Sequence, residues 1–190
     1  KQQAELYRRL RNTLRWLLGS LDGFSDAEKV PYSELPELER WVLHRLTELD
    51  VRIRKATMDY DWSGVYPEVH QFCATDLSAF YFDVRKDSLY CDRTDSVRRR
   101  SVRTVLDHLF QCLVTWLAPA LVFTAEEAWT SLGQTESIFT QTYVKLPAVD
   151  TALMAKWQRI QELRNAVNKE IETLREQGQV GSSLQAEVDL

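Results

Sequence analysis

Apolar side chains recur at the spacing of an α-helix along most of the chain, and this period limits the possible fold more than any other feature. In the first segment, leucines repeat every three or four residues, at Leu10, Leu14, Leu17 and Leu21. Because an α-helix has about 3.6 residues per turn, this spacing brings the four side chains onto one face. We therefore predict an amphipathic helix over about residues 2–21, with its leucines buried.

The same period predicts three further long helices, which begin near Pro36, Val65 and Ser96 and end near residues 60, 90 and 117. Pro36 suits the first turn of the helix that begins near it, and Ser63 can cap the helix that begins near Val65. In the helix over residues 65–90, the side chains predicted to face inward are Val69, Phe72, Cys73, Leu77, Phe80 and Val84. Long helices joined by short turns pack as antiparallel neighbours. We therefore predict an all-α fold, an antiparallel helical bundle of four long helices.

A shorter region is expected to follow the bundle. Thr124 and Glu127 have the spacing of a capping box, which predicts a short helix through Trp129. Residues 133–149 contain a proline and scattered β-branched residues, which favours an irregular or extended segment. The short helix is assigned to the bundle and the irregular segment to an appended region.

The C-terminal part of the chain is predicted to contain one more long helix, over about residues 151–177, with Gly178 as its stop. The apolar side chains of residues 184–190 alternate as in a strand. Since a lone strand is not stable, we expect a truncated C-terminal strand that begins a further domain. The predicted organisation is a bundle over 1–132, an appended loop and helix over 133–183, and the start of a following domain over 184–190.

The net charge of −4 argues against a nucleic-acid partner, but the distribution of charge matters more than its sum. Two segments, residues 1–18 and 93–103, are strongly basic, whereas acidic residues concentrate between them in residues 22–39. Two basic patches on an otherwise acidic body can bind a polyanion locally without requiring one. Their cations are Lys1, Arg8, Arg9, Arg11 and Arg15, then Arg93, Arg98, Arg99, Arg100 and Arg103.

Motifs for catalysis or metal binding are absent from the sequence. It has no glycine-rich phosphate loop and no nucleophile elbow, and its three histidines are far apart, at His44, His70 and His108. Its three cysteines form no CxxC pair, so they are expected to be reduced thiols of a cytoplasmic protein. No apolar run approaches the roughly 20 residues that span a membrane. We predict no catalytic residue and no metal site.

Two aspartates raise the question of a buried polar site. Asp76 and Asp83 are seven residues apart, so they share a helix face, and that face lies close to the apolar one. A buried carboxylate needs a partner. We favour a hydrogen bond or ion pair to a neighbouring helix, for instance to an arginine, over a functional role.

The polar stripe of the first helix is the strongest candidate for a binding surface. Arg8, Arg11, Asn12 and Arg15 lie about 140° around the helix from the leucines. Such a stripe is ordinarily a solvated face. Here it lacks the acids four residues away that usually pair such charges, and an amide within it can read a base edge. Together these features favour a ligand with both phosphates and base edges.

Aromatic residues beside the stripe point to the kind of nucleic acid. Tyr7 and Trp16 flank it, and aromatic rings can stack on unpaired bases. A single-stranded loop of RNA would use the cations, the amide and the rings together. In the second basic segment, Arg99 and Arg103 lie one turn apart, which suits a phosphate backbone.

Several motifs in register resemble one protein family. Residues 7–19 resemble the opening helix of the anticodon-binding domain of isoleucyl-tRNA synthetases, and residues 37–43 its second helix. Residues 72–87 resemble the third helix, and residues 117–129 the stretch after the fourth. The resemblance covers about residues 5–190. The valyl and leucyl relatives share the fold and parts of these motifs, but the Leu17-Leu18-Gly19 turn and the Phe72-Cys73 pair favour the isoleucyl family.

This resemblance implies a tRNA-binding module of a longer enzyme. The parent enzyme would use ATP and magnesium to attach isoleucine to its tRNA, and a separate domain would edit valine. The chain has no HIGH-type or KMSKS-type motif, so the module itself is expected to be non-catalytic and without a cofactor. The implied partners are the anticodon stem-loop of isoleucine tRNA and the catalytic and editing domains of the same chain, with no membrane.

The resemblance also assigns candidate tRNA-binding residues. Those for the anticodon side are Arg8, Arg11, Asn12 and Arg15, with Trp16 as either a stacking residue or a core residue. Those for the RNA backbone are Lys86, Tyr90, Arg98, Arg99 and Arg103. The tryptophans expected only to pack are Trp41, Trp62, Trp116 and Trp129. The alternatives are a structural helical domain that touches RNA little, the equivalent domain of a valyl or leucyl relative, and, with least support, a free-standing enzyme.

Overall fold

The structure is a computed structural model that describes residues 2–189, so the predictions made for Lys1 and Leu190 lie outside the described residues. The chain forms two compact units, which meet in sequence at residues 148 and 149. No helix within residues 2–189 has both the length and the apolar character needed to cross a membrane.

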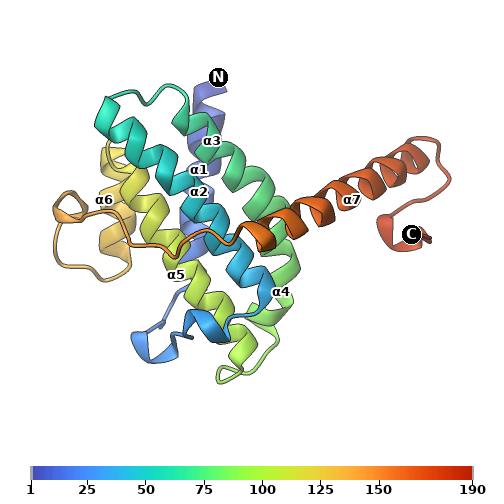
Figure 1. The fold of residues 1–190 in the computed structure, drawn as a ribbon, viewed down its shortest axis with the longest axis horizontal. Coiled ribbons are helices and arrows are strands. Elements are labelled where there is room, and N and C mark those ends of the chain that lie inside the picture. The colour runs from blue at the N-terminus through green and yellow to red at the C-terminus, as the bar shows by residue number, and fades with distance from the viewer. Residues whose placement is uncertain (1, 190) are drawn as a thin grey trace. The chain divides into compact units, whose positions relative to one another are not determined.

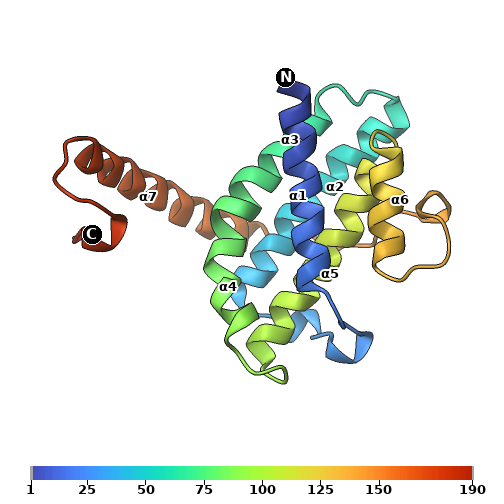
Figure 2. The ribbon, with the colours of Figure 1, turned by 180° about the vertical axis from the view of Figure 1, so that it is seen from behind.

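The first unit is the predicted antiparallel bundle. Its long helices are α1 (Gln2–Ser20), α2 (Glu37–Asp59), the continuous helix formed by α3 (Val65–Gln71), a π-helical stretch (Phe72–Tyr81) and α4 (Phe82–Tyr90), and α5 (Val97–Leu117). Consecutive long helices run in opposite directions, and the shorter α6 (Val122–Ser131) packs beside α1 and α5 (Figures 1 and 2). The all-α prediction is confirmed. Short 3-10 turns occupy Asp26–Glu28, Tyr32–Glu34 and Ile138–Thr140.

The leucine stripe of α1 is buried as predicted. Leu14, Leu17 and Leu21 are each at most 2% exposed, and Leu10 is 8% exposed. These side chains join a core to which α5 contributes most, including Trp116, which is fully buried. The other tryptophans expected to pack also do so: Trp41 and Trp129 are buried, and Trp62 stacks on Tyr66.

The inward face of the third long helix differs from the prediction at its C-terminal end. Val84, predicted to face inward, is 47% exposed, whereas Tyr81 and Phe82 are buried. The π-helical stretch over Phe72–Tyr81 explains the difference, because a π turn holds more residues than an α turn and so rotates every later position around the axis. Counting at 3.6 residues per turn therefore fails beyond it.

Two predicted helix caps do not form. Ser63 donates its hydroxyl hydrogen bond to Asp61 Oδ1, and α3 begins after Gly64 without a side-chain cap. Thr124 lies inside α6, which begins two residues earlier, and its hydroxyl pairs instead with the Tyr7 hydroxyl at 3.0 Å. The capping-box spacing at Thr124 thus reflects a tertiary contact between α1 and α6.

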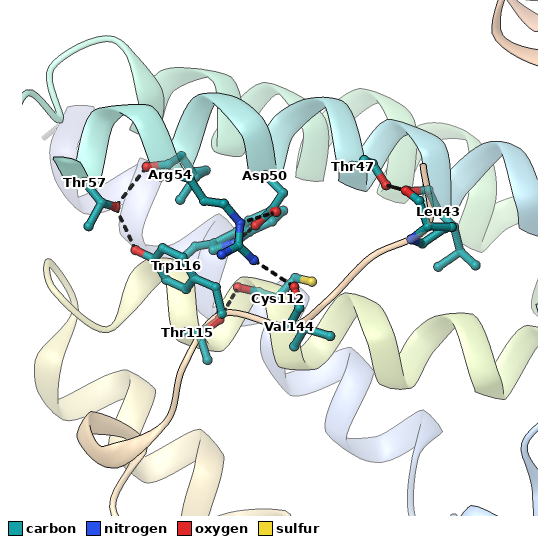
Figure 3. Close-up of polar contacts among 12 residues, drawn as sticks. Leu43, Thr47, Asp50, Arg54, Thr57, Cys112, Thr115, Trp116 and Val144 are labelled. Carbon is teal, nitrogen blue, oxygen red and sulfur yellow. Dashed lines mark hydrogen bonds and ion pairs between the residues drawn. The ribbon is translucent and has the colours of Figure 1, made fainter. Parts of the chain in front are cut away.

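The segment after α6 belongs to the first compact unit, which ends at residue 148. The expected boundary between bundle and appended region, at residue 132, stays a prediction. The segment is irregular, as predicted, and α2 holds it by donating hydrogen bonds to its backbone. Arg54 Nη2 lies 2.9 Å from the carbonyl oxygen of Val144, and Thr47 Oγ1 lies 3.0 Å from that of Pro147 (Figure 3). Ile138, in the same segment, is 2% exposed.

The second unit contains α7 (Thr151–Glu176), close to its predicted span. The Asp150 side chain caps it by accepting a hydrogen bond from the backbone N–H of Leu153. Gly178 follows with a φ of 71°, a left-handed conformation that glycine adopts without strain, and so ends the helix as predicted. The truncated strand is not confirmed: within residues 2–189 no strand forms, and Ser183–Gln185 is a 3-10 turn.

We predict that Leu17→Ala lowers the free energy of unfolding by about 2–5 kcal/mol, because it removes a fully buried side chain and leaves a cavity. Val84→Ala, on the helix face that the π turn directs outward, is expected to change it by less than about 0.5 kcal/mol. Urea denaturation of both variants measures the difference. Equal losses would show that Val84 is a core residue after all.

Candidate nucleic-acid interface

The four polar residues predicted for the anticodon side lie together on the exposed face of α1. Arg8 is the most outward: its side chain is 69% exposed and pairs with Glu5 at 2.5 Å. Glu5 also accepts a hydrogen bond from Arg9 at 3.2 Å, and the bonds from Arg8 and Arg9 lower its pKa. The stripe is therefore partly neutralised at its N-terminal end, by an acid one turn before the arginines.

Arg11 is held by an acid from a distant part of the sequence. Its guanidinium makes two hydrogen bonds to the Glu127 carboxylate of α6, at 2.7 and 3.1 Å, across 116 residues. These bonds lower the pKa of Glu127 and raise that of Arg11. With the nearby contact between Tyr7 and Thr124, the pair fastens α1 to α6. Arg11 thus has a structural partner that the local sequence does not reveal.

Asn12 and Arg15 are the stripe residues that remain available. Both are exposed, and neither side chain has a hydrogen-bond or ion-pair partner within residues 2–189. Beside Asn12, Trp16 stacks on Phe82 of α4, with ring centroids 3.9 Å apart and planes 21° apart. Trp16 and Asn12 also line a cleft of about 480 Å³, with Ser78 on its other side. Trp16 is therefore a half-buried residue that packs on α4 and forms part of a cleft wall.

The residues predicted for the RNA backbone divide between paired and unpaired side chains. Arg98 makes two hydrogen bonds to Asp92, at 2.6 and 2.7 Å, and Lys86 pairs with Asp83 at 2.8 Å. Both cations stay more than half exposed. Arg99 is half-buried and donates to the carbonyl oxygen of Leu89. Tyr90 is 68% exposed.

Arg103 lies inside the protein and is not available to a ligand. It is 4% exposed and donates hydrogen bonds to the carbonyl oxygens of Ser20 and Asp22 and to the Glu28 carboxylate. Its guanidinium also lies over the Phe24 ring, 5.3 Å from the centroid. Arg103 thus anchors the loop between α1 and α2 to α5. The sequence predicts a phosphate contact for Arg103 because it lies one helical turn from Arg99. In the structure, the Arg103 side chain is buried in the core instead.

The two aspartates considered from the sequence have different environments. Asp76 accepts hydrogen bonds from Arg45 of α2, at 3.0 and 3.1 Å, as predicted. Asp83 is exposed and pairs within its own helix. The more deeply buried acid, missed from the sequence, is Glu39, which is fully buried and accepts two hydrogen bonds from Arg85, at 2.7 and 2.8 Å. This pair is structural.

Charge compensation therefore separates scaffold residues from candidate contacts. Within residues 2–189, no cluster of three or more histidine, cysteine, aspartate or glutamate side chains is arranged to hold a metal ion. The features left for a ligand are an amide, a cation and a half-exposed indole along α1, with further exposed cations near the turn between α4 and α5. An RNA loop, with phosphates and unpaired bases, matches this set.

Residues 39–190 match a protein family described as the anticodon-binding domain of tRNA ligases. Among curated relatives, the isoleucine–tRNA ligase of Gluconobacter oxydans is 54% identical over the whole chain, which covers 20% of that protein. The isoleucine–tRNA ligases of Agrobacterium fabrum and Caulobacter vibrioides are 45% and 44% identical over 96% of the chain, which covers 19% of each. The chain spans about a fifth of the length of these relatives.

We predict that Arg103→Met lowers the free energy of unfolding by about 2–4 kcal/mol, because it leaves two carbonyl oxygens and a carboxylate without their donor. Arg98→Met removes the same charge at an exposed position, so the stability of this variant is expected to match that of the unsubstituted chain. Thermal and urea unfolding measure both. A stable Arg103→Met variant would return Arg103 to the candidate contacts.

Proposed function

The chain belongs to the family of anticodon-binding domains of tRNA ligases, and from this premise we propose that it binds the anticodon stem-loop of isoleucine tRNA. The exposed face of α1 is the proposed contact surface. The observation that carries the proposal is that Asn12 and Arg15, whose side chains have no partner within residues 2–189, lie beside the half-exposed ring of Trp16. The isoleucine specificity follows the names of relatives up to 54% identical.

Each group on α1 has a distinct proposed role. The Asn12 amide can both donate and accept, so it can read the edge of an unpaired base. Arg15 supplies a cation for a neighbouring phosphate, and its contribution should weaken as salt rises. Trp16 offers the part of its ring that Phe82 does not cover. Arg8 contributes more weakly, because Glu5 already pairs with it.

The turn between α4 and α5 supplies a second proposed contact, with the RNA backbone. Lys86, Tyr90, Arg98 and Arg99 lie at or near the surface there, while Arg103 is left out because it is buried. The two exposed ion pairs in this group are solvated and contribute little to stability, so a phosphate can compete for their cations. Arg11 is likewise proposed as a secondary contact, behind its bond to Glu127.

We further propose that the chain works as part of a longer isoleucine–tRNA ligase in the cytoplasm. ATP, magnesium and isoleucine would bind in the catalytic domain, and an editing domain would lie elsewhere in the same protein. The bundle would then hold the tRNA while chemistry proceeds at a distance. This role needs no catalytic group in the bundle, where arginines engage the buried Glu39 and the half-buried Asp76.

One alternative has a specific observation in its favour. Arg11, Arg98 and Arg103 all have intramolecular partners, as expected of a structural domain that positions its neighbours and touches RNA little. The equivalent domain of a valyl or leucyl ligase is the other alternative. Comparing the affinity of the chain for tRNAs with different anticodons separates the proposed function from these two alternatives.

We predict that the chain prefers the isoleucine anticodon stem-loop over one with a swapped anticodon, and that affinity falls as salt rises. Asn12→Ala should remove most of the preference, since it removes the base-reading amide. Arg15→Gln should weaken both RNAs alike and reduce the slope of log affinity against log salt by about one. Fluorescence anisotropy at several salt concentrations measures both effects.

The matched control is Arg52→Gln, which removes an exposed cation from α2, where Glu68 is its partner. It should change neither the preference nor the salt slope. Absence of binding at low salt would support the structural alternative. A preference for a valine or leucine anticodon would reassign the family member.

We also predict that the chain alone does not catalyse isoleucine-dependent exchange of pyrophosphate into ATP. The reason is that the proposed ATP and isoleucine sites belong to another domain. A radiolabelled exchange assay, with an intact isoleucine–tRNA ligase as the positive control, measures this. Exchange above background would mean that the bundle has an unrecognised catalytic site.

A further inference from the structure

A second cleft, of about 920 Å³, opens between α1, α3 and the turn from α5 to α6. This volume lies within the range of ligand-binding clefts. Residues of the α2–α3 and α5–α6 connections line the cleft. Both connections lie at the end of the bundle where α1 begins (Figures 1 and 2). We call this cleft the aromatic cleft, after its wall residues Tyr7, Trp62, Tyr66 and His70.

The wall contains two tyrosines whose hydroxyl groups are already occupied. Trp62 and Tyr66 are stacked, with centroids 5.6 Å apart and planes 13° apart. The Tyr66 hydroxyl donates to the carbonyl oxygen of Trp116, and burial raises its pKa to about 12, so the ring is neutral. The Tyr7 hydroxyl pairs with Thr124. What these residues can offer a ligand is therefore mainly ring surface.

The polar groups that the wall offers a ligand are the side-chain amides of Gln3 and Gln71, which are exposed and line the cleft. An amide can both donate and accept a hydrogen bond, so it can pair with the edge of a base. The Nε2 atom of His70, by contrast, is shielded from solvent and is not open to a ligand in the cleft. The cleft thus combines flat aromatic surface with two accessible amides.

The surroundings of the aromatic cleft are suited to a nucleic acid. Phe123, at the start of α6, is 89% exposed, and Tyr60, two residues before Trp62, is 88% exposed. Tyr60 has a φ of 53°, the left-handed conformation in which helices such as α2 commonly end. Arg8, whose side chain is 69% exposed, follows Tyr7 in α1. Exposed rings beside a cation fit stacked bases joined by phosphates.

We propose that the aromatic cleft receives one unpaired base of the RNA bound along α1. The base stacks on the Tyr66 and Trp62 wall and pairs its polar edge with the amides of Gln3 and Gln71. Tyr7 in this cleft and Arg15 on the first surface are eight positions apart, or about 12 Å along the helix, so one RNA loop spans both. An apolar side chain of a protein would fill the walls but leave the amides of Gln3 and Gln71 without a partner.

This inference rests on the proposed function, and a variant that fills the cleft tests it. Ala120→Trp places an indole at an exposed turn residue that lines the cleft, without removing a core side chain. The matched control is Val51→Trp, at an exposed position of α2, a helix that neither lines the cleft nor takes part in the proposed RNA contacts. Circular dichroism establishes that both variants fold. The probe is the isoleucine anticodon stem-loop, with 5-iodouridine placed at each loop position in turn.

We expect Ala120→Trp to weaken binding by about tenfold to a hundredfold, the loss of one stacked base, and Val51→Trp to leave it unchanged. Photocrosslinking to the unsubstituted chain should join at least one loop position to Trp62 or Tyr66. Binding that Ala120→Trp does not alter, with crosslinks confined to the Trp16 region, would overturn this inference and leave the proposed function standing. Absence of RNA binding by the unsubstituted chain would overturn both this inference and the proposed function.

Discussion

The burial of α5 is the constraint on which the rest of the bundle depends. Nearly every residue from Ser101 to Leu117 is buried, so α1, α2, α4 and α6 have to cover it from all sides. Such a helix must also satisfy the polar groups that it carries inward. Thr104 does so by accepting a hydrogen bond from the backbone of Val30, and Arg103 by bonding the carbonyls of the α1–α2 loop. The irregular loop is thereby fixed to the core by the central helix.

The internal ion pairs of this scaffold determine which charges remain for a ligand. The chain is acidic overall, so most arginines find a carboxylate, and the deepest pair joins Arg85 to the fully buried Glu39. A long-range field that would attract RNA is not expected from a net charge of −4. Affinity has to come from a few unpaired groups in shaped clefts. We therefore expect affinity to depend on Asn12 and Arg15 and not on the buried Arg103.

Sequence periodicity was sufficient for the helices and the leucine face of α1, because those depend on local spacing alone. It failed where a contact joins distant segments or where the period changes. The acid that pairs with Arg11 lies 116 residues away, so the local spacing of the stripe does not predict this pair. A 3.6-residue pattern predicts that Val84 faces inward, because the pattern does not reveal the π-helical stretch before it. The aromatic cleft, built from α1, α3 and a turn, depends on tertiary packing in the same way.

The rigidity of α1 connects the two proposed binding surfaces. Two contacts to α6, from Tyr7 and Arg11, hold one side of this helix, and the stacking of Trp16 on Phe82 holds the other. A helix fixed on both sides loses little conformational entropy when a ligand binds, so more of the interaction energy appears as affinity. The same fixation sets the spacing between the aromatic cleft and Asn12. Selection of RNA by this surface would therefore depend on loop geometry as well as on base identity, since a loop with the wrong spacing reaches only one of the two.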